Sequence, residues 1–72
     1  MTEETALSMI KDYQKFAIDT NDVLSGIYFR FPKDGSTNKA MRWLGFCQGI
    51  LVARNVFTLE EIKEHSKRGQ VF

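Results

Sequence analysis

The sequence predicts an all-α fold, a small helical bundle that is completed by further copies of the chain. Three observations support this prediction: apolar residues recur at helical spacing, capping signals flank the later segments, and the chain is short. Its 72 residues have room for one hydrophobic core and one domain, residues 1–72. Domains of this size commonly need a disulfide, a metal or oligomerisation. Because Cys47 is the only cysteine, no disulfide can form within the chain, and self-association is expected.

Residues 4–31 are predicted to form one long helix. Pro32 ends it, because proline disfavours helical geometry at the residue before it. Two alternatives remain open: a break at residues 19–22, where N-cap residue types cluster, and a strand over residues 26–31, which are rich in β-prone types. The continuous helix is favoured because residues at alternating steps of three and four cross the whole range in phase. These residues are Ile10, Tyr13, Ala17, Thr20, Leu24, Ile27 and Phe31.

A second helix is predicted over residues 37–54. Ser36 or Thr37 is the expected N-cap, and Asn55 suits a left-handed position after the last turn. This helix is expected to pack against the long first helix as an antiparallel hairpin.

A third, short helix is predicted over residues 59–67. Thr58 and Glu61 have the spacing of a capping box, in which each side chain bonds the other residue's backbone N–H. Gly69 supplies a stop after the last turn. This helix is expected to cover part of the second.

The second helix is apolar around more of its circumference than one neighbouring helix can cover. A surface helix normally keeps an apolar stripe of roughly 100° or somewhat more. Gly45 and Gly49 lie one turn apart, which would let another backbone approach closely, by analogy with small-residue motifs of membrane helices. We therefore expect a homo-oligomer. The residues expected at its interface are Tyr13, Phe16, Thr20, Trp43, Gly45, Phe46, Gly49 and Ile50.

The sequence predicts no catalytic residue, metal site or cofactor. Cys47 and the single histidine, His65, are too far apart for a zinc-ligand spacing, and no CxxC motif is present. Cys47 falls on the core-facing seam of the second helix. His65 is expected on the surface of the third, and no motif ties a nucleophile to it. A non-enzymatic protein is therefore expected.

Charge and hydropathy disfavour further classes of function. The net charge of +1 gives little counterion-release drive for binding duplex nucleic acid. The longest apolar run, residues 50–53, is far shorter than the roughly 20 residues of a membrane span. The acidic start of the chain lacks the basic and apolar regions of a signal peptide. A cytoplasmic protein that does not enter the membrane is expected.

One polar cluster, at the tip of the predicted hairpin, indicates a binding site. Residues 23–58 carry five basic residues and one acidic residue, whereas residues 1–22 carry five acidic and two basic ones. Free N–H groups at a helix start, together with nearby Lys or Arg, favour anions such as the phosphates of a nucleotide. Alternatively, the basic residues pair with the acidic half of another copy. The expected ligand residues are Arg30, Lys33, Ser36, Thr37, Lys39 and Arg42.

Two stretches, KAMRWLGFCQG at 39–49 and FTLEEIKEH at 57–65, resemble small uncharacterised proteins encoded by bacteriophages and prophages. The resemblance covers about residues 36–68 and brings no known activity. It implies a phage accessory protein that acts by binding a host or phage protein in the bacterial cytoplasm. Some small phage helical-hairpin proteins are oligomeric sponges for cyclic-nucleotide signals of host immunity, and this chain is similar to them in size and hairpin plan. An anti-defence nucleotide binder is the alternative.

Overall fold

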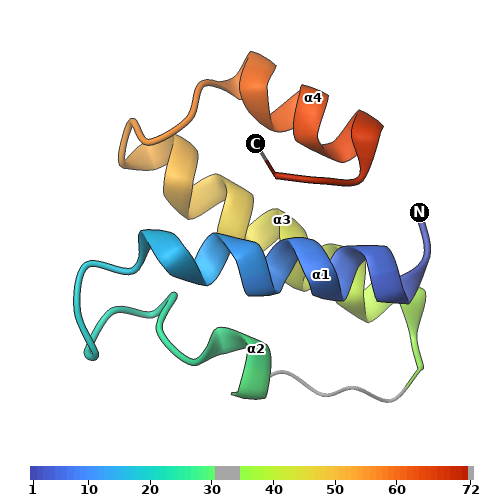
Figure 1. The fold of residues 1–72 in the computed structure, drawn as a ribbon, viewed down its shortest axis with the longest axis horizontal. Helices are drawn as coiled ribbons and strands as arrows, with labels where there is room; N and C mark the ends of the chain where they lie inside the picture. Colours follow the sequence, from blue (N-terminus) through green and yellow to red (C-terminus); the bar gives the residue numbers. More distant parts are fainter. Residues whose placement is uncertain (31–34, 72) are drawn as a thin grey trace.

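The computed structural model describes residues 1–30 and 35–71 and shows a mostly helical chain (Figure 1). No strand occurs within these two ranges. The predicted all-α class is therefore confirmed. The elements are α1 (Glu3–Tyr13), the 3₁₀ helix η1 (Gln14–Phe16), α2 (Ile27–Arg30), α3 (Thr37–Ala53) and α4 (Leu59–Arg68).

The ends of α3 agree with the sequence to within one residue. The Ser36 hydroxyl accepts a hydrogen bond from the backbone N–H of Lys39, as an N-cap does. After the helix, Asn55 adopts a φ of 61°, the left-handed conformation predicted for it. Asparagine tolerates this region better than most residues.

The ends of α4 also follow from local chemistry. The Thr58 hydroxyl accepts from the Glu61 amide at 3.1 Å, and the Glu61 carboxylate accepts from the Thr58 amide at 2.9 Å, which completes the predicted capping box. Gly69 has a φ of 70°, and its amide donates to the carbonyl of His65 at 2.8 Å. The left-handed turn at this glycine ends the helix.

The predicted long helix over residues 4–31 is wrong. After α1 and η1 the chain turns extended at Ala17, where ψ is 136°. Downstream, the Asp22 carboxylate accepts from the backbone amides of Ile18 at 2.8 Å and Leu24 at 3.2 Å. Such side-chain acceptors compete with helical bonding. The alternative with a break in this region is correct, and residues 27–30 are helical rather than extended.

The antiparallel hairpin is not observed, because α1 and α3 begin at the same end of the molecule and run in the same general direction (Figure 1). Tyr13, in the last turn of α1, lies within hydrogen-bond distance of Gln48 in the second half of α3. The short helix α2, which lies between α1 and α3 in the sequence, packs on α1. There the Lys11 ammonium lies 5.8 Å from the Tyr28 ring centre. The helices α1 and α3 therefore pack against each other while running in the same general direction.

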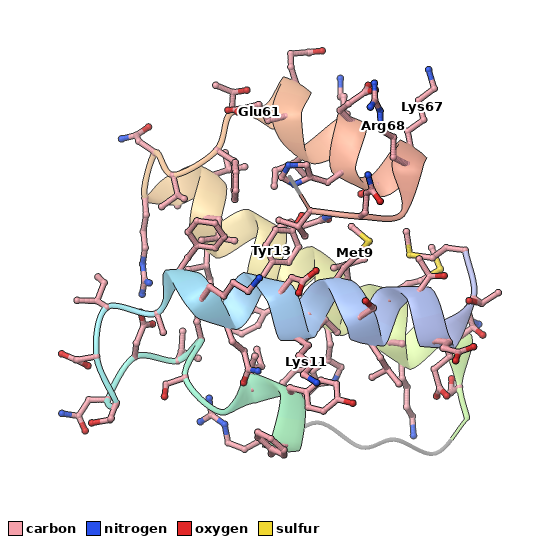
Figure 2. All side chains as sticks on the ribbon, in the orientation of Figure 1. Met9, Lys11, Tyr13, Glu61, Lys67 and Arg68 are labelled. Carbon is pink, nitrogen blue, oxygen red and sulfur yellow. The ribbon has the colours of Figure 1, made fainter. Side chains whose placement is uncertain are left out.

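The chain forms about two layers of helices, because its shortest Cα extent is 16 Å and packed helix axes lie roughly 8–10 Å apart. Figure 2 shows Met9 and Tyr13 pointing from α1 toward α4, whereas Lys11 points toward α2. In a two-layer arrangement every helix keeps a face that its own chain leaves uncovered. The buried apolar core consists of Ala6, Met9, Ile10, Tyr13, Leu24, Ile27, Ala40, Leu44, Cys47, Leu51 and Ile62.

Candidate functional site

The feature most suited to binding is the solvent-facing side of α3, which we call the outer face. Phe46 is 48% exposed and Met41 is 46% exposed on this side. Arg42 is the only charged residue of the outer face, whereas water-facing sides of helices normally carry many charges. An exposed apolar surface of this kind is typical of an interaction site. The outer face consists of Met41, Arg42, Gly45, Phe46, Gly49 and Ala53, all exposed.

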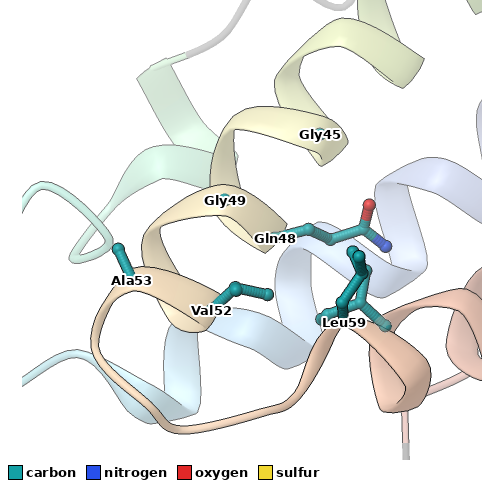
Figure 3. Close-up of a pocket in the computed structure, with 7 residues that line it drawn as sticks. Gly45, Gln48, Gly49, Val52, Ala53 and Leu59 are labelled. Atoms are coloured by element: carbon teal, nitrogen blue, oxygen red, sulfur yellow. The ribbon is translucent and has the colours of Figure 1, made fainter.

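A shallow groove of about 410 Å³, the α3–α4 groove, runs beside the outer face. It is lined by Gly45, Gln48, Gly49, Val52, Ala53, Leu59 and Ile62 (Figure 3). Leu59, at the start of α4, is 57% exposed. Among the described residues, no atom lies within 4 Å of a Cβ placed on Gly45 or Gly49. The two glycines therefore form an open strip and do not support close packing within the chain.

A second hollow, of about 270 Å³, adjoins the outer face at its N-terminal half. Arg42, Trp43 and Phe46 line it. The rings of Trp43 and Phe46 meet edge to face with their centres 6.2 Å apart. Trp43 is partly buried against the core, so the hollow has a firm aromatic wall beside a cationic side chain.

A buried polar cluster joins α1, α3 and α4. The Tyr13 hydroxyl lies 2.9 Å from Nδ1 of His65, and Nε2 of Gln48 donates to the Tyr13 hydroxyl at 3.3 Å and to the Ser66 hydroxyl at 2.9 Å. Burial raises the pKa of Tyr13, with a smaller opposing effect from the Gln48 hydrogen bond. Buried polar groups of this kind must find partners, and here they link three helices.

His65 is 1% exposed, so its expected surface position is wrong. The sequence held a usable signal, because His65 follows Ile62 by three residues and therefore shares its face of α4. The Phe57 ring seals the cluster, with its centre 4.7 Å from that of His65. The arrangement is suited to fixing α4 in place rather than to meeting a substrate.

The thiol of Cys47 is also enclosed. Cys47 is fully buried, and this burial raises its pKa to about 11. Because nucleophilic attack requires the thiolate, the thiol is a poor nucleophile at neutral pH. Its predicted place on the core-facing seam of α3 is confirmed.

The eight residues expected at an oligomer interface separate into two groups. Tyr13 is buried in the chain's own core, so its assignment to an interface is wrong. Phe16 packs edge to face on Phe57 at 5.0 Å and is partly buried, and Thr20 lies exposed in the turn after η1. The other five lie on α3. Of these, Trp43 and Ile50 are partly buried, whereas Gly45, Phe46 and Gly49 are exposed together.

Of the residues expected to bind an anion, Arg30 and Ser36 make hydrogen bonds within the chain. The guanidinium of Arg30 donates to the carbonyls of Val23 and Ser25, which closes the turn before α2. Ser36 is occupied as the N-cap of α3, whose first residue is Thr37. Lys39 is partly buried and Arg42 is exposed one turn into the helix; Lys33 lies outside the described residues.

The chain matches no protein-family model, no curated protein and no solved structure. Within residues 1–30 and 35–71, no helix is long and apolar enough to cross a membrane. The same part of the chain contains no group of three or more His, Cys, Asp or Glu side chains arranged to hold a metal ion.

Proposed function

We propose that this protein is a non-enzymatic helical protein that acts by binding and that self-associates through the outer face of α3. The observation that supports it is the exposure of Phe46 and Met41 on the outer face, whose only charged residue is Arg42, beside the exposed Leu59 of the α3–α4 groove. Enclosure of Cys47 and His65 in the core supports a binding role rather than a catalytic one.

The energetics favour a partner that covers several of these side chains at once. Full burial of a Phe, Met or Leu side chain contributes about 1.5–3 kcal/mol, so a half-exposed one contributes roughly half of that. Association costs at least about 4 kcal/mol in lost translational and rotational freedom. A symmetric pair of chains would bury Met41, Phe46 and Leu59 twice each, which is enough to offset that cost.

Sedimentation velocity over a range of protein concentrations tests self-association. We expect the wild-type chain to sediment above the mass of its 8.3 kDa monomer at micromolar concentration. A Phe46→Glu variant should sediment as a folded monomer, because the interface would lose an apolar side chain and would have to desolvate a carboxylate in its place. Phe29→Glu is the matched control, since Phe29 is 78% exposed and belongs to α2 rather than to the outer face of α3. A monomeric wild-type protein would contradict the proposal.

In a cell, we propose that the assembled protein presents its remaining surface to a host or phage protein in the bacterial cytoplasm. The support is the resemblance of residues 36–68 to small bacteriophage proteins. An accessory role of this kind requires no cofactor.

A phosphorylated nucleotide is the second candidate ligand, and the hollow beside Arg42 favours it. A guanidinium next to aromatic rings suits a phosphate and a stacked base. Titration with a cyclic dinucleotide, followed by the fluorescence of Trp43, tests this candidate. Because Arg42 and Phe46 also belong to the outer face, nucleotide binding would compete with self-association, and an anti-defence sponge of this design would dissociate as it fills.

A further inference from the structure

We propose that α4 is a movable strap, which opens as a unit while α1 and α3 stay packed together, and that Gln48 is the residue that holds it closed. Opening uncovers the side of α1 on which Met9 and Tyr13 lie. The inference goes beyond the proposed function, because this surface lies under α4 and not on the outer face of α3. It concerns a single chain and does not depend on self-association.

The buried apolar side chains are divided unequally among the helices. In α1 they are Ala6, Met9, Ile10 and Tyr13, and in α3 they are Ala40, Leu44, Cys47 and Leu51. The buried side chains of α4 are one isoleucine, Ile62, and the imidazole of His65. Most of the stability of a helix in a protein comes from packing of its apolar face. The helix α4 is therefore held less firmly than α1 and α3.

Polar contacts supply a larger share of the attachment of α4. Nε2 of Gln48 donates to the Ser66 hydroxyl at 2.9 Å and to the Tyr13 hydroxyl at 3.3 Å. The Tyr13 hydroxyl in turn lies 2.9 Å from Nδ1 of His65. The amide of Gln48 thus holds Ser66 directly and His65 through Tyr13. Its removal would take a hydrogen-bond donor from two hydroxyls at the boundary between α4 and the core.

The position of the hinge follows from the contacts on either side of Thr58. Before it, the Val56 amide donates to the carbonyl of Leu51 at 2.9 Å, which ties the linker to the end of α3. The Phe57 ring packs on that of Phe16 with centres 5.0 Å apart. After Thr58, the capping box and the C-terminal glycine satisfy the ends of α4 within the segment itself. A segment with such self-contained ends can open locally without breaking the hydrogen bonds of its neighbours.

The strap covers an apolar part of the core. Figure 2 shows Met9 and Tyr13 pointing from α1 toward α4, and both are almost completely buried. The end of α4 also lies on α1, since a Cβ placed on Gly69 would come within 3.0 Å of Cγ2 of Thr5. Opening would therefore convert a closed part of the core into an accessible apolar surface, next to the α3–α4 groove that Ile62 lines.

Hydrogen exchange in dilute, monomeric protein, followed by mass spectrometry, tests the separate opening. We expect the hydrogen-bonded amides of α4 to exchange together and at least about tenfold faster than those of α1 and α3, relative to the unfolded chain. Tenfold corresponds to about 1.4 kcal/mol. A single rate for all three helices would overturn the proposal.

Two variants separate local from global opening. Gln48→Leu keeps the approximate size and helix propensity of the side chain but removes its donors. It should speed exchange in α4 about fivefold, and in α1 and α3 by the same factor, because its bonds are broken in the open and the unfolded chain alike. Unchanged exchange in α4 would show that Gln48 does not hold the strap.

Ile27→Val is the matched control. Ile27 is buried on α2, and its contacts are kept when α4 opens. The lost methyl group should speed exchange in α1 and α3 about fivefold and leave α4 unchanged. If α4 accelerates as much as α1 and α3 in this control, the chain opens only as a whole and the proposal is wrong.

Oxidation by hydrogen peroxide tests which surface is uncovered. Met9 is 1% exposed and should react through the open strap, whereas Met41 is 46% exposed and reports direct access. Oxidation of Met9 should be about fivefold faster in Gln48→Leu and unchanged in Ile27→Val, with Met41 constant throughout. Acceleration of Met9 oxidation in Ile27→Val would mean that Met9 is uncovered by global unfolding and would overturn its place under the strap.

Discussion

The inner and outer faces of α3 are both apolar, yet only the inner face is covered by the chain itself. The inner face presents Ala40, Leu44, Cys47 and Leu51, all buried, at steps of four, three and four. The outer face replaces branched side chains with two glycines and sets Phe46 beside them. Side chains that interdigitate with α1 build a core, whereas a nearly bare strip leaves room for the backbone of another helix. Hydrophobicity alone does not distinguish these two uses of a helix face.

The largest expected difference is in folding stability, and two leucines measure it: Leu51 on the inner face and Leu59 in the α3–α4 groove beside the outer face. Leu51→Ala should reduce the free energy of unfolding by about 2–5 kcal/mol, because it leaves a cavity under a fully buried side chain. Leu59→Ala, at a position 57% exposed, should cost less than about 1 kcal/mol at concentrations where the chain is monomeric. Urea denaturation of dilute protein provides both values.

At high protein concentration, association should depend on Leu59 more than on Leu51. At concentrations where the wild-type chain is associated, Leu59→Ala should lower the mass measured by light scattering, whereas the folded fraction of Leu51→Ala should still associate. Equal losses of stability at the two positions in dilute solution would mean that Leu59 and the α3–α4 groove are covered within one chain.

The buried thiol of the inner face makes the stability of the chain depend on pH. The pKa of Cys47 is raised by burial from 9.0 to about 11. The stability that depends on a neutral thiol is therefore complete below pH 9 and is lost as the pH rises through 11. Over that range the free energy of unfolding should fall by about 2–3 kcal/mol.

Cys47→Ala is the control for this loss. Its stability at neutral pH will be lower, but its dependence on pH between 9 and 11 should be flatter than that of the wild type. Tyr13, whose pKa is also raised by burial, accounts for the remaining slope. An unchanged slope in the variant would show that the thiol is accessible to solvent in the folded chain.

The C-terminal half could be predicted from sequence because its signals are local. Ser36, Asn55, Thr58, Glu61 and Gly69 each act on backbone groups within a few residues. Caps of this kind have the same effect in nearly any tertiary setting, so the bounds of α3 and α4 were predictable. The outer face was predicted in part from the glycine spacing. The exposure of Leu59 was not, because it depends on how α4 is placed on α3.

The prediction for the first half of the chain was wrong because the interactions that determine its structure link residues far apart in the sequence. Leu24 and Ile27, two residues of the predicted helical seam, are buried in the core, yet the chain reaches that core through a turn and not a continuous helix. Asp22 fixes this turn, and its partner Arg54 lies 32 residues away, after the last turn of α3. The burial of His65 against Tyr13, 52 residues away, was missed for the same reason.

The smallest of the three expected effects is that of Asp22. This residue joins the turn after η1 to the C-terminal end of α3. Both Asp22 oxygens accept from the Arg54 guanidinium, at 2.7 and 2.9 Å, and the bonds to Arg54 and to the Ile18 amide hold the pKa of Asp22 well below its ordinary value of 3.8. Asp22→Asn should lower the melting temperature at neutral pH by several degrees, measured by circular dichroism.

Because the pKa of Asp22 is lowered in the folded chain, its contribution to stability is present above pH 3.8 and is lost as the pH falls below that value. The melting temperatures of wild type and Asp22→Asn should therefore converge in acid. Asp12→Asn is the control, since Asp12 contacts Lys15 at 3.7 Å on the surface and should change the melting temperature far less. If the melting temperatures of wild type and Asp22→Asn still differ at low pH, the effect comes from the amide's altered hydrogen bonds in the turn. In that case the ion pair would not be what joins the turn to α3, and both faces of the helix would be positioned by the apolar core alone.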